Sequence, residues 1–524
     1  MVALWLMLIS CRSTEVVKQE SFATMEEQTL LRRLSVDLRG VLPSQEEYEA
    51  LSDQNALDFV DDFLYDERFG RQVRSLFTDY YRTEVDLFSV SGSDFGVLSE
   101  VSFREAVGQE PLRILQEVAE SDLPWSTIVT ADWTMANETS AQMYPIDYEG
   151  VGWKRSKYTD GRPAAGVMAT NSLWWRYTTT QSNANRNRAN TLSRILLCNN
   201  YLHRPITFER GLDLLDQEAV DDAITNNPSC VGCHQTLDPL AAHLFGFWVL
   251  QNDSYLEVQQ YHPDRERAYE QYLGVAPGYY GSPSYGLTHL GEYIAGDERF
   301  VGCAVEQVSE QLLGRSFSLT DTAWSTPHRN VFVQDGLLLR SLIRSIVSDP
   351  LYRFAWYEDD DQGSNAKLMK PSLVASVIAE KTGFVWKYQE DEMFDNDLVG
   401  LKKLSGGGQV FVEPSATYIL SISRLVEQAA VYVFMQESQM EATQRTFFVE
   451  MDAERIFGDD RSAAVAMIQR WHLLLFGRTI QEDGPEIQAN IELWEGLYQI
   501  HNEAPEAWVG LLTALLRDPD FIVY

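Results

Sequence analysis

The segment Cys230-Val231-Gly232-Cys233-His234 constrains the fold of this chain more than any other part of the sequence. Two thiols three residues apart, followed directly by an imidazole, form the pattern of covalent c-type haem attachment. A helical turn projects these side chains toward one face of a porphyrin, so the thiols can bond to its vinyl groups while the imidazole reaches the iron. We therefore expect one covalent haem c, anchored by Cys230 and Cys233, with His234 as the proximal iron ligand.

Other interpretations of this motif need a different sequence context. A thioredoxin-like dithiol would need a βαβ pattern around it, and half of a zinc site would need a second cysteine pair. The sequence supplies neither, so haem attachment is favoured. The second ring nitrogen of His234 is then expected to find a carbonyl or a water as its hydrogen-bond acceptor.

The sixth ligand of the iron is not fixed by the sequence. His243 is close to His234 and is expected on the proximal side. Candidates from the other side are His262, His289, Met168 and Met369. We prefer His289 because it lies a domain-sized loop away from the motif; its alternative role is that of an ordinary surface or core histidine.

The other three cysteines have separate interpretations. Cys198 and Cys303 stand in apolar helical settings and form either one disulfide or two buried free thiols. Cys11 follows the apolar run 2–10, which is too short to span a bilayer but has the length of a signal-peptide core. Leu8-Ile9-Ser10-Cys11 resembles a bacterial lipobox, which predicts lipidation of Cys11.

This start of the chain predicts export. We interpret residues 1–11 as a lipoprotein-type signal segment and residues 12–23 as a polar tether. The protein would then be held by a lipid anchor at the periplasmic face of the outer membrane or at the cell surface. No Lys or Arg precedes the apolar run, which leaves open a start of the chain upstream of Met1. A frayed apolar N-terminus is the alternative to a signal segment. No later stretch reaches about 18 apolar residues, and the rest of the chain is expected to be soluble.

The charge balance limits the partners. The 524 residues carry 42 Lys and Arg against 77 Asp and Glu, which gives a formal net charge of −35. Such a surface repels phosphate backbones and anionic headgroups. Nucleic acid is therefore excluded as a partner, and the lipid anchor is the only membrane contact expected. A chain of this length exceeds one hydrophobic core, so several domains are expected.

Apolar residues recur at helical spacing, which predicts a mainly α, multi-domain fold with minor β-hairpins. Residues 25–82 begin with a helix that breaks at Gly40. Ser44 and Glu47 form a capping-box pattern at the start of a second helix, which the spacing continues to Phe69. A similar order, in which a helix ends at glycine and an Asp-Pro turn precedes an aromatic residue, returns at 312–352 and 474–521. We expect three divergent copies of one helical unit.

Strand-like texture is confined to short pieces such as 126–133 and 409–412. The acidic run at 358–366 is typical of a solvated linker. We therefore expect an N-terminal helical domain at 24–150, a central c-type cytochrome-like haem domain with a following helical hairpin at 151–357, and a C-terminal helical domain at 367–524.

Two groups of residues carry a resemblance to a known family. The haem motif followed by Leu237-Asp238-Pro239-Leu240 resembles the planctomycete-type cytochrome C domain proteins, whose motif is typically followed by Asp-Pro. The segment 31–40, with Pro43 and Glu46, is similar to the planctomycete-specific domain that accompanies them. Ala241-Ala242-His243 departs from the Gly-Phe that is usual in the family. The resemblance implies an exported mono-haem protein of unsettled role, often encoded beside a sulfatase-like partner.

We expect one-electron transfer with a redox partner as the main activity and assign no catalytic residues. A surface scaffold or partner-binding protein, in which the haem is structural or sensory, is the competing interpretation. A haem enzyme with an open sixth site is a third. The sequence contains no nucleophile elbow, P-loop or His-Glu-x-x-His motif, so electron transfer is favoured over hydrolase or transferase chemistry.

Overall fold

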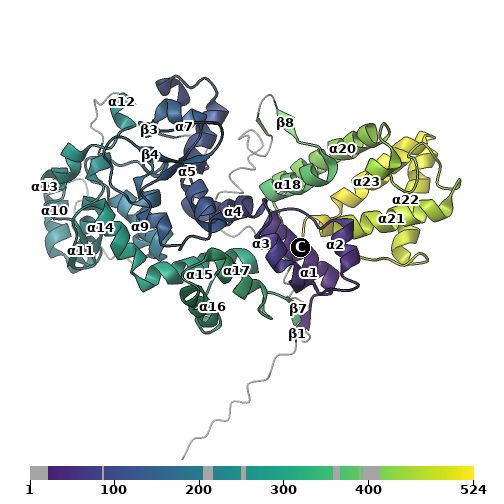
Figure 1. Ribbon diagram of the computed structural model, residues 1–524, viewed down its shortest axis with the longest axis horizontal. Helices are drawn as coiled ribbons and strands as arrows, with labels where there is room; N and C mark the ends of the chain where they lie inside the picture. The colour runs from purple at the N-terminus through teal and green to yellow at the C-terminus, as the bar shows by residue number, and fades with distance from the viewer. Residues whose placement is uncertain are drawn as a thin grey trace, which may run out of the picture.

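The computed structural model describes residues 22–84, 88–204, 216–248, 255–357, 366–388, 391–392 and 414–524. The fold is mainly α-helical with a few short strands, as expected. Figure 1 shows two lobes, one that runs to residue 357 and one of C-terminal helices, and the first helices of the chain (residues 27–64) lie where the two lobes meet. The expected signal segment 1–11, most of the tether 12–23, the acidic run 358–365 and the candidate strand 409–412 lie outside the described residues.

The lobe that runs to residue 357, here called the large lobe, holds most of the helices. Its N-terminal helices are α1 (Glu27–Arg39), α2 (Gln45–Ala50), α3 (Val60–Leu64), α4 (Phe69–Tyr81) and α5 (Glu100–Glu120). The central ones are α6 (Thr127–Thr130), α7 (Glu138–Met143), α8 (Asn171–Arg176), α9 (Arg186–Leu197), α10 (Gln217–Asn226), α11 (Pro228–Ala242), α12 (Tyr255–Val258) and α13 (Tyr269–Tyr272). The last are α14 (Leu287–Ala295), α15 (Glu298–Leu313), α16 (Thr322–Gln334) and α17 (Leu339–Val347).

The C-terminal lobe, here called the small lobe, contains α18 (Pro371–Thr382), α20 (Ala416–Glu437), α21 (Arg461–Phe476), α22 (Pro485–His501) and α23 (Ala504–Arg517). The strands form small antiparallel sheets. They are β1 (Phe22–Thr24) with β7 (Phe354–Tyr357), β2 (Thr134–Ala136) and β3 (Ile146–Asp147) on either side of β4 (Lys154–Tyr158), β5 (Gly278–Tyr279) with β6 (Ser282–Pro283), and β8 (Lys387–Tyr388) with β9 (Asp391–Glu392).

Each lobe has its own main hydrophobic core, and α1 contributes to both. Leu31 and Leu34 pack in the core of the large lobe, whereas Val36 packs in the core of the small lobe. Apolar residues of α1 therefore point in two directions, and both sets are buried. Side chains from both sides of position 150 share the large core. The expected domain boundaries remain predictions.

Local sequence signals set several helix ends as expected. Gly40, Gly314 and Gly477 end α1, α15 and α21 in the left-handed conformation, with φ of 71°, 69° and 64°. At the start of α2, Ser44 Oγ accepts from the amide of Glu47, and the Glu47 carboxylate accepts from the amide of Ser44. These ends depend on neighbouring residues alone, which is why the sequence predicts them.

Two expectations about local structure are wrong. The helix that begins after Ser44 ends at Ala50 instead of continuing to Phe69, because Asn55 starts a second capped turn with Asp58. Residues 126–133 contain the short helix α6 instead of a strand. Turn hydrogen bonds after Pro124 bend this segment, and the Thr, Ile and Val of α6 do not override them.

A turn of one kind recurs four times: an Asp, two further residues and a buried aromatic ring. The Asp carbonyl accepts from the amide of the aromatic residue at 2.9–3.1 Å, and Asp Oδ1 accepts from the amide two residues on at 2.8 Å. The four pairs are Asp66 with Phe69, Asp297 with Phe300, Asp349 with Tyr352, and Asp518 with Phe521. The turn places a ring in a core beside a helix end, whether or not proline is present.

The helix α20 has the length and composition of a membrane span. Its Tyr418, Leu425 and Val433 are buried in the core of the small lobe, where the helix packs against α18 and α23. We therefore interpret α20 as a core helix.

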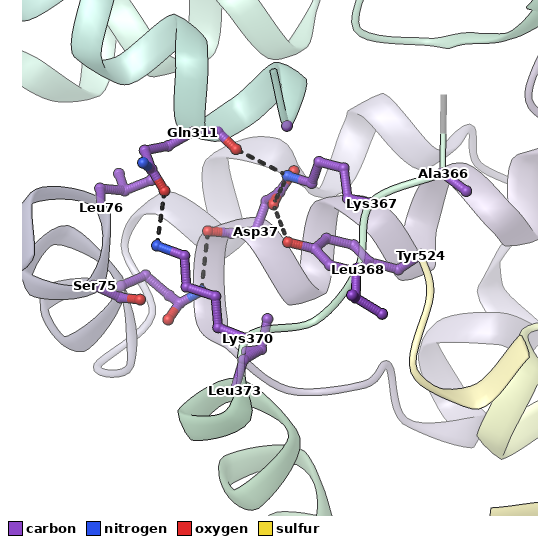
Figure 2. A pocket seen from close by; sticks show the side chains of 12 residues that line it. Asp37, Ser75, Leu76, Gln311, Ala366, Lys367, Leu368, Lys370, Leu373 and Tyr524 are labelled. Atoms are coloured by element: carbon purple, nitrogen blue, oxygen red, sulfur yellow. Dashed lines mark hydrogen bonds and ion pairs between the residues drawn. The ribbon is translucent and has the colours of Figure 1, made fainter. Parts of the chain in front are cut away.

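A buried ion pair joins the two lobes. The Asp37 carboxylate on α1 pairs with Lys367 Nζ and accepts from the hydroxyls of Tyr352 at 2.8 Å and Tyr524 at 3.0 Å. Figure 2 shows Asp37, Lys367 and Tyr524 meeting at the wall of a pocket of about 100 Å³. Burial lowers the pKa of Lys367 to about 8, although Asp37 acts in the opposite direction. The ammonium group thus depends on this carboxylate for its charge.

We predict that Asp37→Asn lowers the free energy of unfolding by roughly 3–5 kcal/mol, because it leaves the Lys367 ammonium buried without a counter-charge. Urea denaturation followed by circular dichroism measures this. Asp37→Asn combined with Lys367→Met should lower the free energy of unfolding less than Asp37→Asn alone. As a control, Glu270→Gln breaks the ion pair between Arg267 and Glu270, whose side chains are 80% and 53% exposed. This variant should leave the urea midpoint of unfolding unchanged. A single variant as stable as the unaltered protein would contradict the prediction.

Candidate functional site

The haem motif lies in the first turns of α11. Asn227 caps this helix by accepting from the amide of Ser229 at 2.9 Å, and Pro228 occupies the first helical position. Cys230, Cys233 and His234 follow at helical spacings of three and four residues, so they share one face. Both thiols are free and half-buried. The structure therefore places the three residues on one face of one helix; their role in haem attachment stays a prediction.

His234 is held by a carboxylate on its own helix. Its Nδ1 lies 2.9 Å from Oδ1 of Asp238, one turn further along α11. Arg186, at the start of α9, donates to both oxygens of the same carboxylate, from Nε at 2.7 Å and from Nη2 at 2.9 Å. We expected a carbonyl or a water as the acceptor for His234; the structure supplies a charged group. The bond uses Nδ1, so Nε2 is the ring nitrogen that can ligate a metal.

The carboxylate of Asp238 is buried, with 6% of its side chain exposed. Burial alone would raise the pKa of Asp238, but the hydrogen bonds from His234 and Arg186 outweigh it and hold the pKa below its usual value. Asp238 is therefore an anion that two cation-forming side chains face. Its spacing of four residues from His234 was visible in the sequence, whereas nothing local indicated that Arg186, a plausible partner of the haem propionates by sequence, would pair with Asp238.

Other contacts fix the motif end of α11 against the lobe. Tyr201 and Thr236 share a hydroxyl hydrogen bond of 2.9 Å, and Arg204 donates to the carbonyl of Gly232 at 3.3 Å. The opposite end packs against β5, where a Cβ on Gly278 would lie 3.3 Å from Pro239 Cβ. Glycine at position 278 thus allows the close approach of this hairpin to the helix.

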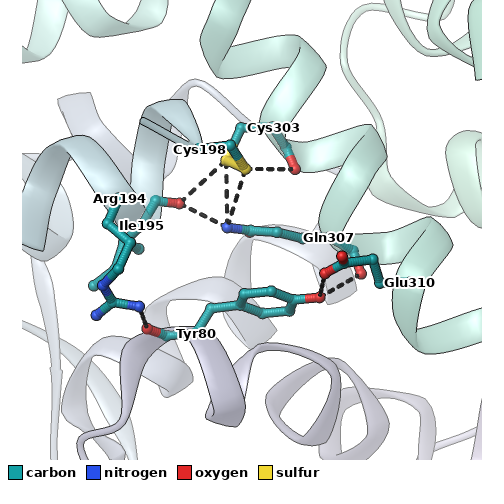
Figure 3. The surroundings of a disulfide bond; sticks show 7 residues. All are labelled: Tyr80, Arg194, Ile195, Cys198, Cys303, Gln307 and Glu310. Carbon is teal, nitrogen blue, oxygen red and sulfur yellow. Dashed lines mark hydrogen bonds between the residues drawn. A yellow bond between two sulfur atoms is a disulfide. The ribbon is translucent and has the colours of Figure 1, made fainter. Parts of the chain in front are cut away.

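The structure joins Cys198 and Cys303 in a disulfide, one of the two arrangements that the sequence left open. Figure 3 shows this bond between Cys198, at the end of α9, and Cys303 on α15. Gln307 Nε2 on α15 donates to the carbonyl of Ile195 at 2.9 Å. Arg194 on α9 donates to the carbonyl of Tyr80 on α4 at 2.8 Å. The helix that carries Arg186 is therefore tied to both α4 and α15.

The candidate sixth ligands lie in different surroundings. His289 on α14 stacks between Tyr285 and Tyr293, with ring centroids 5.6 and 4.5 Å away. Nε2 of His262 lies 2.9 Å from the carbonyl of Glu257, Met168 is buried in the large core, and Met369 is buried in the small core. Burial lowers the pKa of His243 to about 4, so this ring is neutral. The sixth ligand stays a prediction.

No group of three or more His, Cys, Asp or Glu side chains gathers as a metal site within the described residues.

A buried carboxyl outside α11 is Glu110 on α5. It accepts from Thr134 Oγ1 at 2.8 Å and from the hydroxyl of Tyr158. Burial raises the pKa of Glu110 to about 7, against these hydrogen bonds, which lower it. Sequence reasoning missed this residue because its environment comes from the distant strands β2 and β4.

Residues 12–92 match the family model PSCyt2, described as a protein of unknown function (DUF1549). This is the domain family associated with planctomycete cytochrome C proteins, and the resemblance carried by segment 31–40 is confirmed. The match covers the helices α1 to α4 and ends before α5 and before the motif at 230–234. No curated protein and no solved structure matches the chain.

We predict that Cys198 and Cys303 are unreactive in the oxidised protein. A variant with Cys11, Cys230 and Cys233 changed to Ser should show no free thiol after denaturation without reductant, and two after reduction. Because the bond closes a loop with a sequence separation of 105, its reduction should lower the free energy of unfolding by roughly 2–5 kcal/mol. Two thiols before reduction would contradict the disulfide.

We predict that Glu110 makes stability depend on pH. Below pH 4.5 both the folded and unfolded states hold the proton; from there to about pH 7 the unfolded state loses it first, so the free energy of unfolding falls as the pH rises. Over this pH range, the free energy of unfolding of Glu110→Gln should rise by about 3 kcal/mol relative to that of the unaltered protein. Denaturation at several pH values measures the difference. Glu105→Gln, an exposed site on the same helix, is the control, and a pH-independent Glu110→Gln difference would contradict the prediction.

Proposed function

We propose that this chain is an exported c-type cytochrome-like protein that binds one covalent haem on α11 and transfers single electrons. The arrangement of Cys230, Cys233 and His234 supports the proposal best. Two free thiols and an imidazole share one helical face, and Asp238 holds Nδ1 of the imidazole. This donor set fits the group, because haem c needs two thioether bonds and one axial nitrogen on one side.

The residues of the chain have separate roles in this proposal. Cys230 and Cys233 would supply the sulfurs that anchor the group, and Nε2 of His234 would ligate the iron. Haem c, when bound, supplies a reversible one-electron couple. The motif is only half-buried, so a redox partner can approach this end of α11.

Export is part of the same proposal. A disulfide between Cys198 and Cys303 suits an oxidising compartment, which is also where covalent haem attachment occurs. Cys11 would carry the lipid anchor at the periplasmic face of the outer membrane or at the cell surface. The partner is a redox protein or a co-encoded exported protein; the family resemblance favours a sulfatase-like one.

A second candidate function is a partner-binding scaffold in which the haem is structural or sensory. The observation that favours it is the outer face of α20, where Leu420 and Met435 are 68% and 55% exposed. Binding of a partner by protein that lacks haem would support the scaffold, whereas electron exchange with a soluble donor would support electron transfer.

We predict a covalent c-type signature in protein exported from a host with cytochrome c maturation. A pyridine haemochrome assay on the denatured protein should find one haem per chain, and Cys230→Ala with Cys233→Ala should abolish it. Cys198→Ser with Cys303→Ser is the matched control, since it removes as many cysteines but leaves the motif. A folded but colourless protein would overturn the electron-transfer proposal and would favour the scaffold function.

A further inference from the structure

Asp238 joins His234 to a charged group on another helix. Its Oδ1 accepts hydrogen bonds from His234 Nδ1 at 2.9 Å and from Arg186 Nε at 2.7 Å. Its Oδ2 accepts a hydrogen bond from Arg186 Nη2 at 2.9 Å. One carboxylate oxygen is therefore shared between the imidazole and the guanidinium. Any change in the bond to Arg186 changes how strongly Asp238 accepts from His234.

The acceptor on Nδ1 affects what Nε2 does. A carboxylate that accepts from Nδ1 makes the imidazole a more basic ligand. A more basic axial ligand favours ferric over ferrous iron, and such hydrogen bonds are among the means by which a protein sets the potential of a haem. Arg186 acts in the opposite direction, because its two hydrogen bonds withdraw negative charge from Asp238. The surroundings are buried, so these interactions are weakly screened.

We infer that Asp238 and Arg186 are positioning residues that set the reduction potential of the haem iron through His234, Asp238 lowering it and Arg186 raising it. The inference rests on the proposed function. Arg186 belongs to α9, whose far end is fixed to α15 by the disulfide. The guanidinium is thus held relative to α11 by the frame of the lobe.

The test is a spectroelectrochemical titration of the haem-loaded full chain. Asp238→Asn keeps the shape of the side chain but removes its charge, and should raise the ferrous to ferric ratio at a fixed potential about tenfold, which is 59 mV for one electron. Arg186→Gln should lower that ratio. A purely structural role would shift both variants in the same direction or neither, and either result would overturn the inference.

Two further variants separate the relay from general charge effects. Arg204→Gln removes a cation that contacts the motif at Gly232 but not Asp238, and should shift the ratio less than Arg186→Gln. An equal shift would assign the effect to net charge and would overturn the inference. Arg186→Lys keeps the positive charge but loses the bidentate hydrogen bonding of the guanidinium. Its ferrous to ferric ratio should lie between those of Arg186→Gln and the unaltered protein. If the Asp238→Asn protein does not accumulate in the cell, the reduction potentials of the arginine variants decide whether the inference holds. Protein without covalent haem instead refutes the proposed function.

Discussion

The ion pair between Asp37 and Lys367 determines how the two lobes of this protein meet. Burying two charges costs more than their attraction returns unless further hydrogen bonds complete both groups. Here the hydroxyls of Tyr352 and Tyr524 complete the carboxylate, and the carbonyls of Gln311 and Leu312 accept from the ammonium at 3.2 Å. These groups come from segments that are far apart in the sequence. An interaction with so many partners is satisfied in one arrangement only, so it specifies the relative position of the lobes as well as stabilising it.

The same N-terminal helices brace the candidate haem site from a distance. Tyr80 on α4 accepts from Arg194 on α9 through its carbonyl, and donates to Glu310 on α15 at 2.6 Å through its hydroxyl. These are the two helices that the disulfide joins. The position of α9 then decides where Arg186 meets Asp238. A chain of contacts thus leads from the lobe interface to the imidazole of His234, although no residue of α1 to α4 belongs to the motif.

What the sequence could predict is what neighbouring residues decide. The helix ends at Gly40 and Gly477, the capping box at Ser44 and the placement of the motif on one helical face all depend on residues within a few positions. The partners of Asp37 and Glu110 could not be predicted, because they come from strands and loops that only the fold brings together. Asp238 stands between these cases. Its relation to His234 is local, but its charge partner on α9 is not.

The extent of the family match fits this division of roles. The matched segment 12–92 contains Asp37, Asp79 and Tyr80, which bind the small lobe and the helices α9 and α15, but none of the haem motif. Lys370, beside Lys367, pairs with Asp79 on α4, so a second buried carboxylate of the segment holds the small lobe. A segment that supplies ion pairs in one direction and contacts to α9 and α15 in the other is suited to hold α11, and with it the proposed haem site, at a fixed position. We therefore assign the matched segment a positioning role: through α4 it holds α9, whose Arg186 meets Asp238 on α11.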